Sequence, residues 1–174
     1  MRIEHIRHRL RDQGAKSCHE QRVLQAWIRA IPVGTRHRRA EDFLPLRVRQ
    51  SLPALTDQLD GLARLRSEQP SEDGSARLVV ELADGHTVES VLLPRGGLCI
   101  STQVGCAVGC AFCMTGRDGS LRQLGSAEIV AQVALARRRR AVSRVVFMGM
   151  GEPAHNLDNV REAMELLGTI GAVG

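Results

Sequence analysis

The chain has 174 residues, a formal net charge of +5 and 43% apolar residues, but only 2% aromatic residues and no tyrosine. Its core must therefore be built from aliphatic side chains. Five cysteines, three of them within eight residues, argue against a disulfide framework, and no apolar run reaches membrane-spanning length. We expect a cytoplasmic protein with reduced thiols and no membrane contact.

The positive charge comes almost entirely from arginine, because Lys16 is the single lysine. Arginine favours an anionic partner such as RNA, although the same bias can reflect genome composition. The basic run Arg36–Arg39 could contact RNA phosphates, but a solvated loop is the commoner explanation. A second run, Arg137–Arg140, closes a predicted helix, where cations favour the helix dipole, and we assign it a structural role.

Residues 1–68 predict a small helical accessory domain. Residues 1–15 place apolar side chains on one helical face. A second helix opens at Ser17, which forms a capping box with Glu20, and stops before Pro32. A third helix covers about 46–59, and residues 62–68 fit either a helix or a strand.

Residues 69–96 predict a linker and a β-hairpin. Residues 69–76 have the composition of a linker. Two alternating runs, 77–82 and 86–93, flank Asp84-Gly85, which is among the strongest short hairpin signals.

Residues 97–174 alternate strand, loop and helix. A strand at 98–102 leads into a cysteine-rich loop and then a helix that starts with Ser126 as its N-cap. A strand at 144–148 ends in the sequence GMGEP. It is followed by a helix from about 156 to 168, which we expect to bury Leu157, Val160, Met164 and Leu167. This order predicts parallel strands with both loops side by side at their C-terminal ends. Two parallel strands alone do not make a stable sheet, and the 144–148 strand should present an unpaired edge.

Three cysteines with the spacing C-x3-C-x2-C predict a metal or cluster site. They are Cys106, Cys110 and Cys113, and the glycines between them let the loop curl so that several sulfurs face one centre. A structural zinc site would need a fourth ligand, for which His155 or Cys99 could serve. A ferredoxin would want a fourth cysteine nearby, and none follows. Three cysteine ligands fit a [4Fe–4S] cluster that has one free iron better than they fit either of these sites. The free iron of such a cluster can chelate S-adenosylmethionine (SAM).

The motifs extend this interpretation. The cysteine spacing, with Phe112 before the last cysteine, resembles the radical SAM signature. The longer run LCISTQVGCAVGCAFCMTG, followed by VVFMGMGEP and NLDNV, closely resembles the RlmN/Cfr-type adenine methyltransferases. These enzymes methylate C2 or C8 of an adenine in 23S ribosomal RNA, and RlmN-type members also act on transfer RNA. The resemblance is specific over about residues 77–170.

The resemblance assigns roles to seven residues. Cys106, Cys110 and Cys113 would be the cluster ligands, and Gly151 and Glu152 would bind SAM, with the carboxylate accepting from its amino group. Two further residues have functional and ordinary interpretations. Glu89 would be the proton acceptor, although by itself it fits a solvent-facing strand position. Cys99 would be the thiol that resolves the covalent RNA adduct, and a buried strand cysteine is an equally good interpretation.

The resemblance therefore implies a partial radical SAM (β/α) barrel, preceded by a helical accessory domain and a hairpin. It also implies an RNA substrate and an external electron donor such as a flavodoxin. The family's methyl-carrying cysteine belongs to a C-terminal half that these residues do not match, so we expect the 174-residue chain alone not to methylate RNA. A radical SAM enzyme with another substrate, or a non-catalytic zinc or RNA-binding module, are the alternatives.

Overall fold

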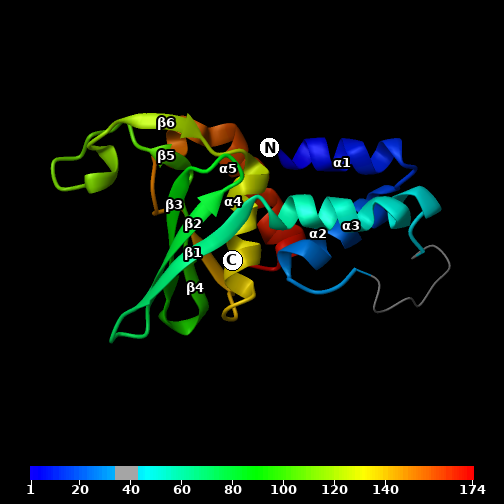
Figure 1. Ribbon diagram of the computed structural model, residues 1–174, viewed down its shortest axis with the longest axis horizontal. Coiled ribbons are helices and arrows are strands. Elements are labelled where there is room, and N and C mark those ends of the chain that lie inside the picture. Colours follow the sequence, from blue (N-terminus) through cyan, green and yellow to red (C-terminus); the bar gives the residue numbers. More distant parts are fainter. Residues whose placement is uncertain (34–42) are drawn as a thin grey trace.

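The structure is a computed structural model that describes residues 1–33 and 43–174. A sheet lies at one end of the molecule and three N-terminal helices lie at the other, with two further helices between them (Figure 1). This mixed α/β fold confirms the fold class that the sequence predicts. The basic run Arg36–Arg39 lies outside the described residues.

The predicted helices and strands occur in the predicted order. The helices are α1 (Ile3–Asp12), α2 (Ser17–Ile28), α3 (Leu46–Asp60), α4 (Ser126–Arg137) and α5 (Leu157–Leu166). The strands are β1 (Ala63–Pro70), β2 (Ala76–Leu82), β3 (Thr87–Leu93), β4 (Gly97–Cys99), β5 (Gln103–Gly105), β6 (Ser120–Gln123) and β7 (Arg144–Val146). The structure thus adds the strands β5 and β6, which the sequence did not predict.

Five strands form one sheet in the order β1-β2-β3-β4-β7. Strands β1 to β4 are antiparallel to their neighbours, whereas β4 and β7 are parallel. The predicted parallel pair is therefore confirmed, but it does not stand alone, because β4 joins it to the hairpin. Strands β5 and β6 form a separate antiparallel pair.

The structure corrects two assignments around the hairpin. Residues 62–68, ambiguous in sequence, belong largely to β1, which pairs with β2. The expected linker at 69–76 begins inside β1 and ends inside β2, so only 71–75 is a turn. The division of the chain at residues 68 and 96 stays a prediction; one strand crosses the first boundary.

The predicted capping box of α2 is wrong. Ser17 is the first helical residue and Lys16 is the N-cap, whose backbone N–H donates to His19 Nδ1 at 3.0 Å. Glu20 instead accepts from Arg11 Nε at 2.8 Å. The carboxylate of Glu20 thus bonds a residue of helix α1 and does not cap α2, contrary to what the local sequence pattern indicates.

Ser126 is likewise not the N-cap of α4. That position belongs to Gly125, whose N–H donates to Glu128 Oε2 at 2.8 Å. The backbone of Met1 passes over Gly125 so closely that an added Cβ would lie 2.1 Å from the Met1 carbonyl oxygen. The Ser126 hydroxyl accepts from the Ile3 N–H at 2.8 Å and donates to Glu162 at 2.6 Å, so it joins α1 to α5.

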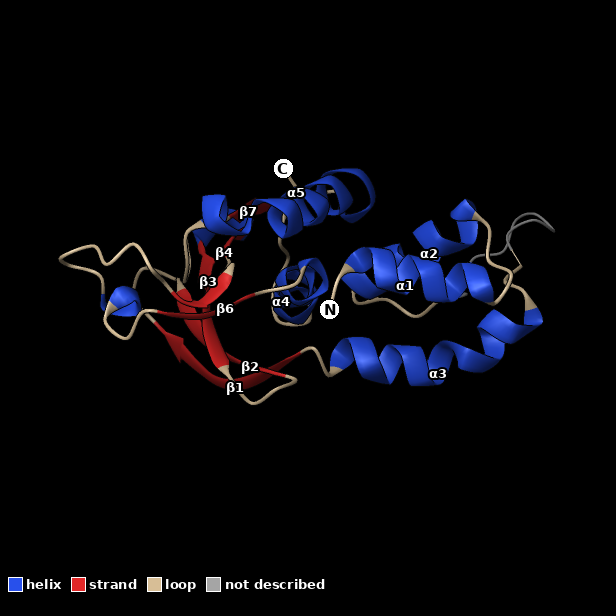
Figure 2. Ribbon diagram, turned by 90° about the horizontal axis from the view of Figure 1, so that it is seen from above, coloured by secondary structure: helices blue, strands red, loops and turns tan. Residues whose placement is uncertain are grey.

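Helix α4 is the centre of the molecule. It lies between the sheet, α5 and the N-terminal helices (Figure 2), and ten of its twelve residues are buried. A helix that is apolar on every side must be covered on every side, which the sequence SAEIVAQVALAR anticipates. One apolar cluster runs from α1 through α4 to the sheet.

Two expectations about the C-terminal part need correction. Leu157 and Met164 are exposed. The other two residues expected to be buried, Val160 and Leu167, are buried, and Ala163 and Leu166 are buried with them. Strand β7 is an edge strand of the sheet, but its edge is not wholly unpaired. The N–H of Val145 donates to the carbonyl of Gly174 at 3.0 Å, and the N–H of Gly174 donates to the carbonyl of Ser143 at 3.1 Å.

The arginines of the second basic run have partners within the fold. Arg137 donates to the carbonyls of Gly171 and Val142, and Arg138 pairs with Asp60. The remaining two bond Glu68 and the carbonyl of Gly74. These contacts confirm the structural role predicted for the run.

Candidate functional site

The cysteine loop, residues 106–119, connects β5 to β6. It extends away from the sheet as the yellow-green loop at the left of Figure 1. The loop is closed at its base, where the Cys106 N–H donates to the Gly119 carbonyl at 2.9 Å. An antiparallel strand pair therefore holds both ends of the thiol-bearing segment together.

The three thiols of this loop are free. Cys106 is half-buried, whereas Cys110 and Cys113 are exposed. A hydrogen bond from the Thr115 hydroxyl, with backbone N–H groups nearby, lowers the pKa of Cys113. A lower pKa favours the thiolate, the form that ligates metals.

The donor chemistry of the loop fits an iron–sulfur cluster, because three accessible thiols lie within eight residues of chain. In the described part of the chain, no three His, Cys, Asp or Glu side chains converge as a metal site, and that includes these thiols. Gly109 has φ +64° and open space around it. The assignment of the three cysteines as ligands stays a prediction.

The GMGEP loop, residues 149–153, follows β7 and lies on the segment that connects β4 to β5. We call that segment, residues 100–103, the crossing segment. The Gly149 N–H donates to the Ile100 carbonyl at 3.0 Å, and the Met150 carbonyl accepts from Thr102 at 2.8 Å and from Gln103 at 3.2 Å. The two stretches thus meet backbone to backbone.

This close approach requires glycine at two positions. A Cβ on Gly149 would lie 2.7 Å from the Ile100 carbonyl group. A Cβ on Gly151 would lie 2.5 Å from Gln103 Cβ, and Gly151 also has φ +95°, a conformation that other residues avoid. The glycines of GMGEP are therefore explained by packing in this fold.

Glu152 is positioned by the same segment. Its backbone N–H donates to Gln103 Oε1 at 2.7 Å, and Gln103 is 1% exposed. Its carboxylate accepts from the Ala154 N–H at 3.0 Å and so caps the turn Pro153–Asn156. A carboxylate has about four acceptor positions, so this one retains capacity for a ligand's ammonium group.

The crossing segment connects the two loops. Gln103 bonds Glu152 and is also the first residue of β5, which leads within three residues to Cys106. The hydroxyl of Thr102, at 1% exposure, has no hydrogen-bond partner among the described residues. The thiol loop and the carboxylate loop therefore diverge from a single buried polar segment.

Glu89 and Cys99 lie on one face of the sheet. Cys99 pairs with Val91 of β3, two residues along from Glu89, so the two side chains are diagonal neighbours, typically about 7–8 Å apart. The opposite face carries the buried Val88, Leu92 and Leu98 and packs toward the core. The uncovered face thus carries both residues.

The two side chains differ in environment. Burial raises the pKa of Cys99, although a hydrogen bond with the Met148 backbone acts against it. Glu89 is 43% exposed and pairs with Arg77 at 3.1 Å. This pairing is what an ordinary strand glutamate would show, and its role as proton acceptor stays a prediction.

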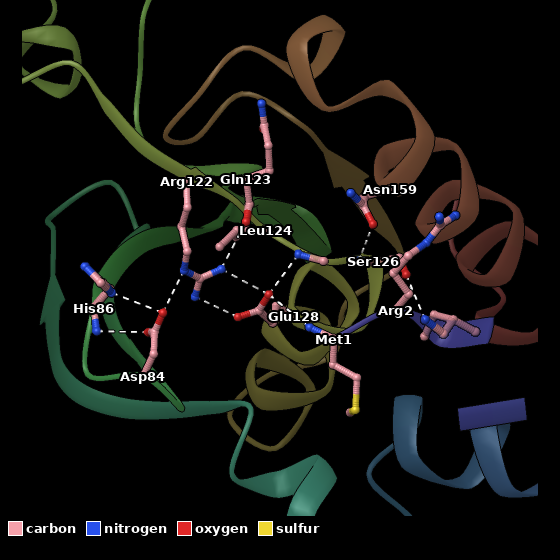
Figure 3. A network of polar contacts seen from close by, with 12 residues as sticks. Met1, Arg2, Asp84, His86, Arg122, Gln123, Leu124, Ser126, Glu128 and Asn159 are labelled. Atoms are coloured by element: carbon pink, nitrogen blue, oxygen red, sulfur yellow. Dashed lines mark hydrogen bonds and ion pairs between the residues drawn. The ribbon is translucent and has the colours of Figure 1, made fainter. Parts of the chain in front are cut away.

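The base of the cysteine loop is anchored by charge. Arg122 of β6 donates to Asp84 at 2.7 Å and to Glu128 at 2.8 Å (Figure 3). Glu128 also contacts the amino group of Met1 at 3.4 Å. Burial raises the pKa of Asp84, but hydrogen bonds from Arg122 and His86 outweigh it and lower that pKa to about 2.

Sequence reasoning missed the residues that hold the site together, chiefly Ser101, Gln103 and Gln132. Gln132 is fully buried and bonds the backbone of Ser101 on both sides. A lone glutamine inside an otherwise apolar helix is a usable signal, because a buried amide needs partners. The polar run Ser101–Gln103 directly after an apolar strand is a second one.

Comparison with known proteins agrees with this geometry. Residues 100–171 match the family model of the Radical SAM superfamily. Over its whole length the chain is 71% identical to a probable RNA methyltransferase of Leptothrix cholodnii and 72% identical to one of Aromatoleum aromaticum, covering 50% and 49% of those proteins. It thus spans about half the length of the curated relatives it matches.

A solved structure gives the same picture. A radical SAM methyltransferase from Sphaerobacter thermophilus is 26% identical and superposes with a TM-score of 0.69 over 96% of this chain and 50% of that one. In the part of the chain that the structure describes, no helix is long and apolar enough to span a membrane. The segment with the three thiols and the GMGEP loop thus matches the Radical SAM superfamily, and the chain as a whole is similar to half of a methyltransferase.

Proposed function

We propose that this chain forms part of a radical SAM enzyme that methylates C2 of an adenine in 23S ribosomal RNA, and in transfer RNA as a second substrate. The observation that carries the proposal is the crossing segment, which joins a three-thiol loop to a glycine-constrained carboxylate loop. The names of the relatives support an RNA substrate. The motif resemblance supplies adenine and its C2 position.

Each residue has a role that its position allows. Cys106, Cys110 and Cys113 would hold a [4Fe–4S] cluster, and Gly151 and Glu152 would bind SAM. When bound together, cluster and SAM supply a carbon radical, with the electron coming from an external donor such as a flavodoxin. The Glu152 carboxylate would accept hydrogen bonds from the SAM ammonium group, which orients the bound molecule.

Glu89 and Cys99 would act on the RNA adduct. A glutamate on the open face of the sheet can accept the C2 proton once it leaves Arg77. Cys99, its diagonal neighbour, would attack the sulfur of the family's methyl-carrying cysteine, so that a disulfide forms and the bond from that sulfur to the RNA-bound carbon breaks. The released carbon would keep the electron pair of that bond and take up a proton as the methyl group. Since burial raises the pKa of Cys99, the thiol needs a base before it attacks. Because Glu89 takes the C2 proton in this scheme, water at the open face of the sheet would take the thiol proton.

The cofactor part of the proposal is tested by anaerobic reconstitution of the chain with iron and sulfide. We expect cluster absorption, about four irons per chain as the cluster formula requires, and SAM cleavage on reduction. Cys113→Ala should abolish both, while Cys18→Ala, a cysteine on α2, should change neither. Stoichiometric zinc without a cluster would overturn the proposal and favour a zinc module.

The RNA part is tested in cells. Deletion of the gene should remove 2-methyladenine from 23S ribosomal RNA, measured by mass spectrometry of nucleosides, and the wild-type gene should restore it. Glu89→Gln should fail to restore it, whereas Glu68→Gln, on β1 of the same sheet, should succeed. Loss of 8-methyladenine instead, or no change in adenine methylation, would contradict the assignment to C2.

A further inference from the structure

The hydroxyl of Ser101 joins the two halves of the site. It donates to the Glu89 carbonyl at 2.5 Å and accepts from the Met150 N–H at 2.8 Å. Glu89 belongs to β3, and Met150 belongs to the GMGEP loop, which follows β7. Since β3 and β7 are the two strands that pair with β4, this one buried hydroxyl connects one neighbour of β4 to the loop that follows the other. The Ser101 side chain itself is buried, with 0% exposure.

Gln132 fixes the orientation of Ser101. Its Oε1 accepts from the Ser101 N–H at 2.9 Å, and its Nε2 donates to the Ser101 carbonyl at 2.9 Å. The amide group thus pairs with Ser101 as a neighbouring strand would, from helix α4. Ser90 donates to the same Oε1 at 2.9 Å, which ties β3 into the network.

We propose that Ser101, held by Gln132, is a positioning residue that fixes the GMGEP loop relative to strand β3. In this position Glu152 would contact SAM while Glu89 contacts the RNA adenine bound beside it. The inference rests on the proposed function for its purpose, and on the hydrogen bonds alone for its geometry. Buried networks in which each member is satisfied are rigid, and substrate binding depends on such preorganisation.

The structure supplies a matched control. Ser90→Ala and Ser101→Ala each delete one buried hydroxyl from the same network, and Ser90 is 1% exposed. Both variants should lose stability, and Ser101→Ala should lose more, because the Ser101 hydroxyl makes two hydrogen bonds and the Ser90 hydroxyl makes one. Only Ser101→Ala frees the Met150 N–H and with it the GMGEP loop, so a difference between the two variants at that loop reports positioning rather than general stability.

The first measurement is the binding of SAM to the anaerobically reconstituted chain by calorimetry. We expect Ser101→Ala to raise the dissociation constant about tenfold and Ser90→Ala to change it less than about twofold, since one lost buried hydrogen bond corresponds to about a factor of ten. Equal weakening in both variants, or no weakening in Ser101→Ala, would overturn the inference.

The second measurement needs no cofactor. Amide hydrogen exchange of the segment that contains Met150 should accelerate at least about tenfold in Ser101→Ala and stay near wild type in Ser90→Ala. If the wild-type chain binds no SAM, the proposed function fails, and the positioning role of Ser101 is then tested by amide hydrogen exchange alone. Unchanged exchange at Met150 in Ser101→Ala would refute the positioning role, whether or not the chain binds SAM.

Discussion

The GMGEP loop and the cysteine loop are both glycine-rich and both follow short strands, yet they are held in opposite ways. GMGEP is pressed onto the crossing segment, and its glycines stand where a Cβ would collide with other atoms. The cysteine loop extends outward, with Phe112 at 94% and Met114 at 72% exposure. The protein itself shapes its carboxylate loop, whereas the thiol loop is anchored at its ends and leaves most of its side chains uncovered.

Substitution of Gly151 by alanine should give the largest effect. The new Cβ would meet Gln103 at 2.5 Å, and φ +95° strains any L-residue. We expect the free energy of unfolding to fall by about 2–4 kcal/mol, measured by urea denaturation. Gly109→Ala in the cysteine loop meets no atom within 4 Å and should cost about 1 kcal/mol. Equal losses would remove the contrast between the loops.

Replacement of Gln132 by leucine should come next. It leaves the N–H and carbonyl of Ser101 buried without partners, so we expect a loss of about 2–3 kcal/mol in unfolding free energy. Gln21→Leu, at an exposed position of α2, should stay within about 0.5 kcal/mol of wild type. If Gln132→Leu lowers the unfolding free energy as little as the control does, the hydrogen bonds between Gln132 and Ser101 contribute little to stability.

Thiol reactivity should separate the two regions without mutation. Cys113 is exposed and its pKa is lowered, whereas burial raises the pKa of Cys99. Near neutral pH we expect Cys113 to react with iodoacetamide at least about ten times faster than Cys99. Timed alkylation followed by peptide mass spectrometry measures both rates in one sample. Similar rates would show that Cys99 is as accessible as the loop thiols.

Acid should loosen the base of the cysteine loop by a small amount. Asp84 has a pKa of about 2 in the folded chain and about 3.9 when unfolded. A lowered folded pKa means that the stabilisation is present above about pH 4 and is lost as the pH falls toward 2. The side chain is 40% exposed, so solvent screening limits the effect to about 0.5 kcal/mol.

The Asp84→Asn variant isolates that contribution. It should be less stable than wild type at about pH 5, and the difference should shrink by about pH 3 as wild-type Asp84 also loses its charge advantage. Urea midpoints at the two pH values measure it. A difference that is independent of pH would mean that the substitution disturbs the hairpin turn rather than the ion pair with Arg122.

Strong local signals in the sequence predicted the helices, the hairpin and the parallel pair of strands, but strands β5 and β6 were not predicted. Asp84-Gly85, for example, predicted the hairpin. The prediction of helix caps from the sequence failed where a side chain near the helix start bonds a distant segment of the chain. Glu20 and Ser126 have the pattern of helix caps but bond Arg11 and α1 instead. Local spacing carries no information about such partners.

The same limit applies to the site. Motif and spacing singled out the thiols, Gly151 and Glu152, and their roles remain predictions. Nothing in the spacing indicates that Gln132, some distance along the chain from the GMGEP loop, supports Ser101 beneath it. That relation depends on α4 crossing the sheet, which is a tertiary fact. A polar residue inside an apolar helix is the sequence signal that indicates such a tertiary contact.

The contacts of α1 with Ser126 and Glu162 have a consequence for biosynthesis. Helix α1 leaves the ribosome before α4 and α5, but the side chains that bind its first turn lie 123 and 158 residues later, in those two helices. At about 5–20 residues per second, α1 waits on the order of 8–32 s for Glu162. During that time its apolar face, Ile3, Ile6 and Leu10, lacks its final neighbours in α4. Helix α1 therefore completes its contacts with Ser126 and Glu162 only after the chain through α5 has been synthesised.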